Sequence, residues 1–163
     1  MREPEQLTLA LPDESATRAF GGALARTLGA VAPSAFLLTL QGDLGAGKTT
    51  LARALLGALG VAGPVRSPTY TLLESYPIGG RVVHHLDWYR LGGAEDLEGL
   101  GFRELCTAGH WLIVEWPERI PAVAAGADLA IELRYEGVAR RLTALGRTVA
   151  GRRVLAALSE DGA

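Results

Sequence analysis

The stretch from Gly42 to Thr49, Gly-Asp-Leu-Gly-Ala-Gly-Lys-Thr, constrains the fold more than any other part of the sequence. It matches the pattern G-x-x-x-x-G-K-[ST] at every position. A nearly continuous apolar run, Phe36–Leu40, precedes it, and a helical pattern with one apolar stripe follows from 49 to 59. Glycines let the backbone wrap closely round a phosphate with its N–H groups inward, and the following helix adds the positive end of its dipole. The segment therefore predicts a strand–loop–helix unit that binds phosphate groups.

Lys48 is the only lysine among the 16 lysine and arginine residues of the chain. The planar fork of arginine cannot replace a compact ammonium inside a tight loop, which gives this single exception a chemical reason. We expect Lys48 to contact the β- and γ-phosphates of a nucleotide, and the Thr49 hydroxyl to be a ligand of Mg²⁺. The alternative is a glycine-rich turn that contains a lysine by accident, and the strand and helix patterns on either side argue against it.

The rest of the chain alternates short apolar runs with helical patterns and turn signals, without repeats or a linker. This alternation predicts an α/β protein with a P-loop NTPase-like three-layer fold and a mixed, mainly parallel central sheet. We expect a single domain over residues 1–163. The expected strands are 6–11, 36–40, 69–76, 82–86, 111–114, 127–135 and 142–145, and the expected helices are 12–28, 49–59, 94–100 and 151–158, with a turn at 77–80.

Composition excludes several classes of protein. A net charge of −2 and two arginine pairs, 140–141 and 152–153, are too little for a nucleic-acid footprint. The single cysteine, Cys106, excludes an internal disulfide framework and is expected in the core. No apolar run approaches the roughly 18 residues that a membrane helix needs. We therefore expect a cytoplasmic protein that contacts no membrane.

Two acids, Asp87 and Glu115, each follow a buried-strand pattern. Proteins of the α/β class bind ligands at the carboxyl ends of their strands, so these acids are candidates to hold Mg²⁺ and to orient the attacking water. The residues alone leave open which acid does which, and a helix cap or a surface acid is the alternative for both. Thr69 is either a γ-phosphate sensor or a strand residue. His85 would share a strand face with Asp87, although a structural histidine is the more common case.

Four strings carry a resemblance to a known family. They are Gly42–Thr50 (GDLGAGKTT), Ser67–Leu72 (SPTYTL), His85–Leu91 (HLDWYRL) and Glu115–Glu118 (EWPE). In this order and at similar spacing, over about residues 37–120, they resemble the bacterial TsaE (YjeE) family. Members of that family are small ATPases required for the threonylcarbamoyladenosine modification of tRNA. The combination is far more specific than any single string, and the match is loose after residue 120.

The resemblance implies roles for individual residues. Asp87 would be catalytic and would polarise the water that attacks the γ-phosphate, together with Lys48 and Glu115, and Mg²⁺ would lie near Thr49 and Glu115. Residues 67–71 would act as a switch segment, with Trp116 close to the site. The implied nucleotide contacts are Asp43, Gly45, Ala46, Gly47, Lys48, Thr49, Thr50 and Thr69.

The resemblance also implies a function and partners. The chain would bind and hydrolyse ATP with Mg²⁺, slowly alone and faster with TsaB-like and TsaD-like proteins, whose complex modifies adenosine 37 of tRNA. It would meet tRNA only through that complex, and a monomer is favoured for the free protein. A small-molecule kinase with the same loop is the main alternative, and a nucleotide-dependent binding module with negligible turnover is another. A GTPase switch is excluded because its Asn-Lys-x-Asp string needs an asparagine and a second lysine, which the chain lacks.

Overall fold

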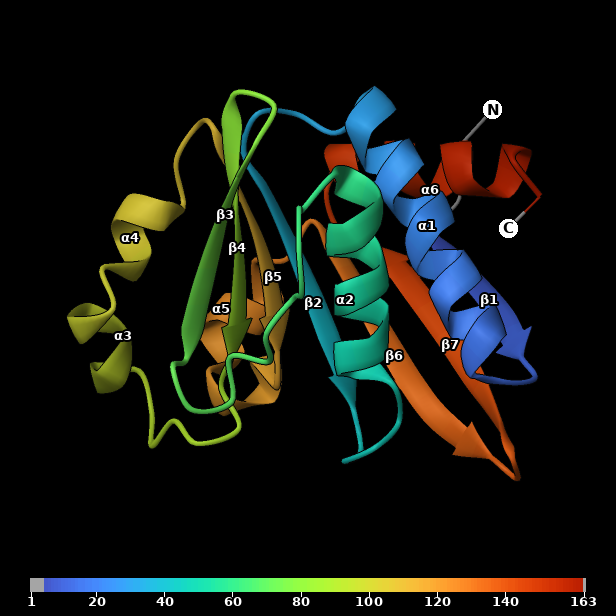
Figure 1. Ribbon diagram of the computed structural model, residues 1–163, viewed down its shortest axis with the longest axis horizontal. Helices are drawn as coiled ribbons and strands as arrows, with labels where there is room; N and C mark the ends of the chain where they lie inside the picture. Colours follow the sequence, from blue (N-terminus) through green and yellow to red (C-terminus); the bar gives the residue numbers. More distant parts are fainter. Residues whose placement is uncertain (1–4, 163) are drawn as a thin grey trace.

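A seven-stranded sheet organises the computed structural model, which describes residues 5–162 (Figure 1). Its strands lie in the spatial order β1-β7-β6-β2-β5-β4-β3, so chain neighbours are often not sheet neighbours. Their bounds are β1 Gln6–Leu11, β2 Phe36–Gly42, β3 Leu73–Ile78, β4 Arg81–Asp87, β5 His110–Glu115, β6 Leu129–Glu136 and β7 Ala139–Gly146.

The four central strands are parallel, and the edges are antiparallel. β2 pairs in parallel with β5 and β6, and β5 pairs in parallel with β4. The hairpins β3–β4 and β6–β7, and the pairing of β1 with β7, are antiparallel. Strands covered on both faces read as continuous apolar runs, and the adjacent residues Thr39 and Leu40 of β2, which point to opposite faces, are both buried. The predicted mixed sheet with a mainly parallel centre is confirmed.

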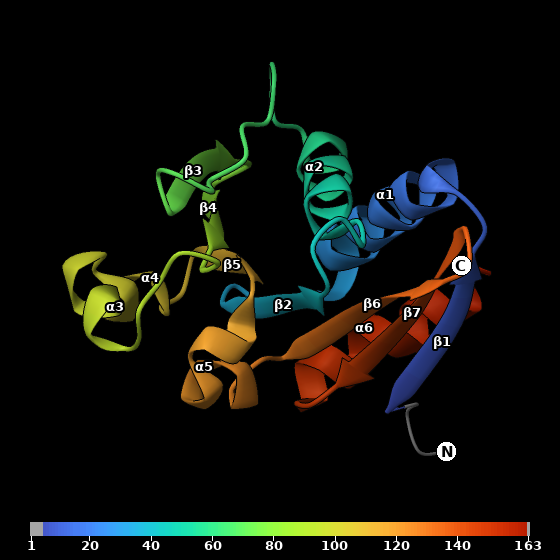
Figure 2. The same cartoon turned by 90° about the horizontal axis from the view of Figure 1, so that it is seen from below.

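Helices cover both faces of the sheet, which gives the three predicted layers (Figure 2). α1 (Glu14–Val31) and α2 (Lys48–Leu59) lie on one face, and α6 (Val149–Glu160) lies on the other. Four short helical segments, α3 (Glu95–Gly99), α4 (Phe102–Leu105), η1 (Pro117–Arg119) and α5 (Pro121–Ala125), follow β4 and β5. None of the helices in residues 5–162 is long and apolar enough to cross a membrane.

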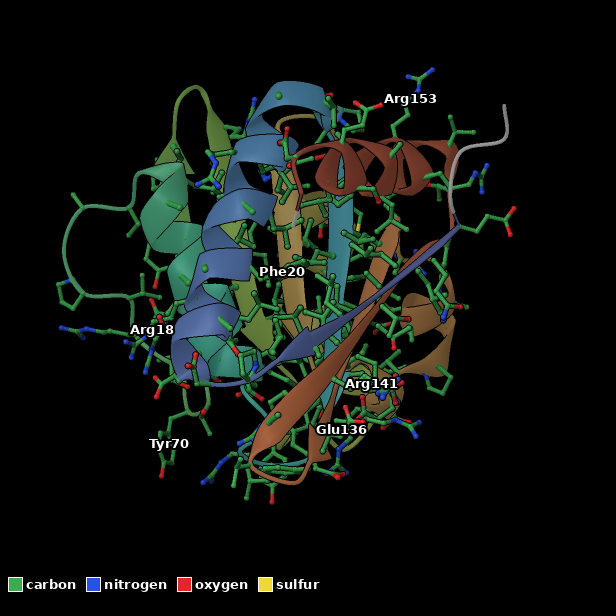
Figure 3. The ribbon with its side chains drawn as sticks, turned by 90° about the vertical axis from the view of Figure 1, so that its right-hand side faces the viewer. Arg18, Phe20, Tyr70, Glu136, Arg141 and Arg153 are labelled. Atoms are coloured by element: carbon green, nitrogen blue, oxygen red, sulfur yellow. The ribbon has the colours of Figure 1, made fainter. Side chains whose placement is uncertain are left out.

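Helices α1 and α2 pack closely against each other at Gly21. A Cβ placed on Gly21 would lie 2.8 Å from the Cβ of Ala54 and 3.1 Å from the carbonyl oxygen of Leu51. Glycine is unfavourable inside a helix, and this close approach gives Gly21 a packing reason. Next to it, Phe20 points from α1 toward the sheet and is buried (Figure 3). Helix α2, which begins at the glycine-rich loop, is thereby fixed against a helix of 18 residues.

Three local expectations are wrong. The segment expected to be a strand from residue 69 is a turn as far as Leu72, whose φ is 66°, and β3 begins only at Leu73. Pro77 was expected in the turn but lies within β3, because this strand is at the edge of the sheet, where a missing N–H costs little. Cys106 was expected in the core but is exposed, since it caps the end of the short helix α4.

Candidate functional site

The glycine-rich loop joins the end of β2 to the start of α2 in a conformation that requires glycine. Gly42, Gly45 and Gly47 have φ angles of 152°, 78° and 111°. A Cβ on Gly42 would also collide with the carbonyl oxygen of Leu133 in β6. These values lie in the region that residues with a side chain rarely adopt, so the loop keeps its close backbone curvature only with this sequence.

The N-terminus of α2 has no side-chain cap, unlike those of the other two long helices. Asp13 accepts a hydrogen bond from Ala16 N at the start of α1, and Thr148 accepts one from Gly151 N at the start of α6. The N-cap of α2 is Gly47, which has no side-chain oxygen to offer. The first backbone N–H groups of α2 therefore face the loop without a protein side chain, in an arrangement suited to an anion.

Lys48 lies inside the loop rather than on the surface, with 4% of its area exposed. Its ammonium donates to the carbonyl oxygens of Gly42, at 2.5 Å, and of Asp43, at 2.9 Å. It also lies 4.1 Å from the centre of the Trp116 ring, a cation–π contact. Burial lowers the pKa of Lys48, and the nearest carboxylates, led by that of Glu115, act in the opposite direction.

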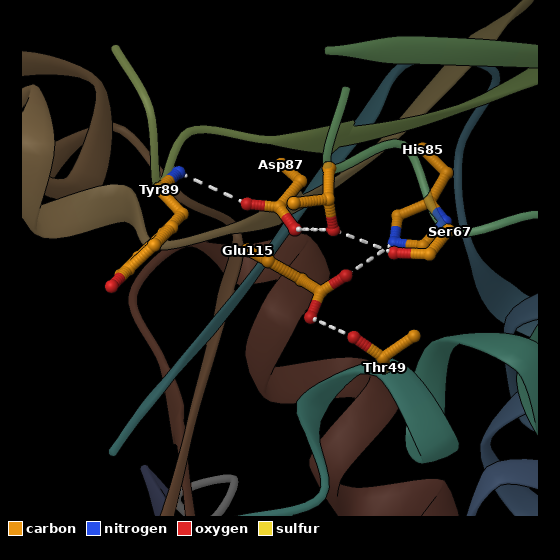
Figure 4. A network of polar contacts seen from close by, with 7 residues as sticks. Thr49, Ser67, His85, Asp87, Tyr89 and Glu115 are labelled. Atoms are coloured by element: carbon orange, nitrogen blue, oxygen red, sulfur yellow. Dashed lines mark hydrogen bonds and ion pairs between the residues drawn. The ribbon is translucent and has the colours of Figure 1, made fainter. Parts of the chain in front are cut away.

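The two acids predicted at strand ends lie side by side. Asp87 of β4 and Glu115 of β5 are register partners of adjacent parallel strands. Glu115 is 1% exposed, and its Oε1 accepts a hydrogen bond of 2.7 Å from the Thr49 hydroxyl at the start of α2 (Figure 4). The other oxygen, Oε2, lies 2.7 Å from Nε2 of His85. The helix start, the end of β5 and the histidine therefore form one hydrogen-bonded group.

Asp87 is held from a different side. Its Oδ1 accepts a hydrogen bond of 2.9 Å from the backbone N–H of Tyr89, and its Oδ2 accepts one of 3.2 Å from the Thr69 hydroxyl (Figure 4). Thr69 in turn lies 2.8 Å from the Ser67 hydroxyl. Burial raises the pKa of Asp87, the Tyr89 N–H opposes this shift, and the charge of Glu115 adds to it. Asp87 is thus a buried acid linked to the segment that was predicted to act as a switch.

A cleft of about 240 Å³ lies between the loop, the two acids and two aromatic rings. The rings of Tyr89 and Trp116 are 4.9 Å apart at one side of it. Most of the predicted site residues line the cleft, namely Gly45, Gly47, Lys48, Thr49, Thr50, Thr69, Asp87 and Glu115. The two exceptions are Asp43, which is exposed, and Ala46, which is buried and lines a smaller cavity toward α1. The nucleotide and metal contacts of all these residues stay predictions.

The residues that support the loop from behind were missed at the level of sequence. The Tyr135 hydroxyl donates to the carbonyl oxygen of Leu44, at 3.0 Å, and the Arg140 guanidinium donates to that of Ala46, at 3.2 Å. The guanidinium of Arg140 also lies 4.1 Å from the centre of the Tyr135 ring. Both residues come from the β6–β7 hairpin, more than 90 positions from the loop. No local pattern signals such a contact.

The donor set fits a hard divalent cation held together with phosphate. Within the described residues, no group of three or more His, Cys, Asp or Glu side chains could hold a metal ion by itself. The cleft offers the hydroxyl oxygen of Thr49 and the carboxylate of Glu115, which are oxygen ligands of the kind that Mg²⁺ takes. Mg²⁺ commonly uses one or two protein ligands and completes its shell with phosphate oxygens and water. These residues therefore fit Mg²⁺ only if a phosphate is bound next to them.

The fold and the loop together define a three-layer α/β protein with a P-loop NTPase-like sheet. The family model for threonylcarbamoyl adenosine biosynthesis protein TsaE matches residues 11–143, which is most of the chain. The chain therefore belongs to the TsaE family, and it has a role in tRNA threonylcarbamoyladenosine biosynthesis.

Individual relatives agree with this assignment, and one solved structure agrees with the fold. The chain is 38% identical over 156 residues to the tRNA threonylcarbamoyladenosine biosynthesis protein TsaE of Haemophilus influenzae, and this alignment covers 95% of the chain and 99% of the relative. It is 39% identical to the protein of the same description from Synechocystis, over 68% of the chain and 70% of that relative. The crystal structure of YdiB from Bacillus subtilis matches with a TM-score of 0.78 over the whole of both chains. At 24% identity this last likeness shows the fold alone.

Proposed function

We propose that the protein is a Mg²⁺-dependent ATPase that serves the threonylcarbamoyl modification of tRNA adenosine. The observation that carries the proposal is the hydrogen bond from Thr49 to Glu115, since it joins the first turn of an uncapped helix to the carboxyl end of a neighbouring strand. A phosphate bound at the helix start and a cation bound between the two side chains would then be neighbours. This is the arrangement that phosphoryl transfer requires.

Binding of the phosphates would rest on the loop and on Lys48. The N–H groups at the start of α2 point at the cleft, and the positive φ angles of the loop bring further backbone close to the ligand. Lys48 now donates to two carbonyl oxygens of its own loop. We expect it to exchange at least one of them for an oxygen of the β- or γ-phosphate. Its partly desolvated ammonium is suited to that exchange, because burial already separates it from water.

The two acids would divide the work of the site. Both oxygens of Glu115 are already engaged, one by Thr49 and one by His85, so Glu115 is fixed near the place of the metal. Mg²⁺, when bound, would neutralise charge on the phosphate oxygens. Asp87 instead accepts from Thr69 and Tyr89 at the cleft wall, and burial raises its pKa toward the range useful to a general base. We assign Asp87 to orient and deprotonate the attacking water.

Water is a better candidate for the acceptor than a metabolite. Small-molecule kinases generally use a mobile lid with arginines and a substrate pocket beyond the phosphates. Here the chain after α2 forms the β3–β4 hairpin, which joins the sheet edge and ends at Asp87 itself. This arrangement favours hydrolysis over transfer to a second substrate.

The partners would be a TsaB-like and a TsaD-like protein, and tRNA would be met through their complex. This part rests on family membership, and the net charge of −2 agrees with a chain that leaves most tRNA contacts to others. Thr69 and Ser67 would connect the nucleotide site to the partners, since the Thr69 hydroxyl donates to Asp87 and the Ser67 hydroxyl in turn contacts that of Thr69. A partner that shifts this segment would change the position of Asp87. Hydrolysis should therefore be slow in the free protein and faster in the complex.

Calorimetry with Mg·ATP tests the nucleotide assignment. Wild-type protein should bind, and Lys48→Ala should lose most of the affinity, while Arg53→Ala on the exposed face of α2 should bind as the wild type does.

Asp87→Asn should bind nucleotide normally but hydrolyse it more slowly by a factor on the order of 10²–10⁴, as for a lost general base. A folded wild type that gives no heat with Mg·ATP would refute the proposal. Equal hydrolysis with and without the two partners would refute partner activation alone.

A further inference from the structure

His85 is a buried polar residue to which the steps above assign only a contact with one oxygen of Glu115. It lies on β4 with no exposed area, on the same face as Asp87, and diagonally across from Glu115 on β5. Its Nε2 lies 2.7 Å from Oε2 of Glu115. Its other ring nitrogen, Nδ1, is buried and has no hydrogen-bond partner within the described structure. A polar atom left unpaired in the interior is costly, so the contact of Nε2 with Glu115 must be what maintains the orientation of the ring.

The contact to Glu115 fixes where the imidazole carries its proton. A carboxylate only accepts hydrogen bonds, so Nε2 must be the donor. His85 thus donates to Glu115 through Nε2, and this bond holds its ring in one orientation. The Glu115 carboxylate is correspondingly held at both ends, because Thr49 donates to its other oxygen at 2.7 Å.

We infer that His85 is a positioning residue for the metal site, which holds Glu115 in the rotamer that presents its free lone pairs to Mg²⁺ beside Thr49. This inference rests on the proposed function and adds a residue to it. His85 touches neither nucleotide nor water. Its effect is exerted through Glu115, as outer partners of metal ligands generally fix the orientation of those ligands.

The neighbouring residue His84 provides a matched control. It is also buried and lies on the same strand, but it points to the opposite face. There its Nδ1 lies 2.7 Å from the Ser75 hydroxyl and its Nε2 lies 2.8 Å from Nδ1 of His110. Loss of a buried histidine from β4 should therefore damage the fold similarly at either position, but only His85 should affect the metal.

The test compares binding of ADP with and without Mg²⁺ by calorimetry in four proteins, namely wild type, His85→Leu, His85→Gln and His84→Leu. In His85→Leu we expect metal-free ADP to bind within about twofold of wild type, while the affinity gained from Mg²⁺ falls about 10–100-fold, as for lost outer partners of metal ligands. His85→Gln keeps an N–H donor at the place of Nε2 and should recover most of that gain. His84→Leu should keep all of it.

Each alternative result is decisive. A full Mg²⁺ effect in His85→Leu, an equal loss in His85→Gln, or the same loss in His84→Leu would overturn the positioning role while leaving the nucleotide site intact. Absence of ADP binding in folded wild type would instead overturn the proposed function and this inference with it.

A second measurement needs no nucleotide. The ring nitrogen signals of His85 should show Nε2 protonated, and those signals should shift in Glu115→Gln. A ring with its only proton on Nδ1 would overturn the inference even if His85→Leu prevented folding.

Discussion

Replacement of Gly21 by alanine tests how closely α1 must approach the helix that follows the phosphate loop. A Cβ at this position would lie 2.8 Å from Ala54 Cβ, 3.1 Å from the carbonyl oxygen of Leu51 and 3.2 Å from the backbone nitrogen of Leu55. Two of these three atoms belong to the backbone of α2. They cannot give way as the tip of a side chain does, so the whole helix has to shift.

Two opposing effects set the size of the change. Alanine is favoured over glycine inside a helix by about 0.8–1 kcal/mol. An extra methyl group forced into a packed interface costs about 1–3 kcal/mol. Gly21→Ala should therefore lose up to about 2 kcal/mol of unfolding free energy after the helix gain is counted. At the adjacent Gly22, a new Cβ would meet only the end of the Arg26 side chain, at 3.6 Å, so Gly22→Ala should keep its gain of about 0.8–1 kcal/mol.

Urea unfolding followed by circular dichroism measures both variants against wild type. Equal m values would show that unfolding exposes the same amount of surface in each protein, so that differences between the midpoints report differences in stability. We expect the Gly21 variant to unfold first and the Gly22 variant last, with about 1–3 kcal/mol between them. If the two alanine variants were equally stable, the close helix contact would not be a real constraint on the fold.

Three further predictions concern single residues. Burial raises the pKa of Asp87, so this acid should take up a proton, and ATP turnover should fall, at a pH higher than that at which an ordinary aspartate is protonated. This loss of turnover at low pH should disappear in Asp87→Asn. An unchanged pH profile in that variant would exclude Asp87 as the general base. Asp128 accepts from the Leu37 N–H at 2.8 Å and from the Thr148 hydroxyl at 2.7 Å. Asp128→Ala should therefore cost about 1–3 kcal/mol in urea unfolding, against a smaller loss in Asp128→Asn. Arg140→Ala removes a bond to a loop carbonyl, so nucleotide affinity should fall about 2–10-fold in calorimetry, and unchanged affinity would make that bond irrelevant to binding.

Much of the fold was predictable because its signals are local. The apolar run of β2, the loop and the stripe of α2 lie next to one another in the chain, and each appears where expected. The wrong expectations concern residues whose state is decided by distant partners. Pro77 is tolerated in β3 because β3 is an edge strand of the sheet formed by residues 5–162, and sheet order is not encoded in a short window. Likewise, Leu72 contacts a distant residue, since its carbonyl oxygen accepts a hydrogen bond of 3.2 Å from the N–H of Asp87.

The same division applies to the site. Lys48 and Thr49 follow from the loop pattern, and Asp87 and Glu115 follow from the rule that parallel strands end at one edge. The contact of His85 with Glu115 could not be predicted, because period-two alternation gives its face but not its partner. Which residues support the loop from behind was likewise invisible, since Arg140 reaches it from a hairpin far along the chain.

The pairing of β2 with β5 has a consequence for the order in which the protein matures. Their register joins Phe36 to Trp111, and 74 residues lie between these positions. During synthesis, the glycine-rich loop and α2 emerge well before β5, so the growing chain has the loop for some time without Glu115 opposite it. The entropic cost of closing that long segment must be overcome before β5 can pair with β2. A nucleotide that prefers the complete cleft would thus act late in folding, and would trap the finished topology rather than guide the chain toward it.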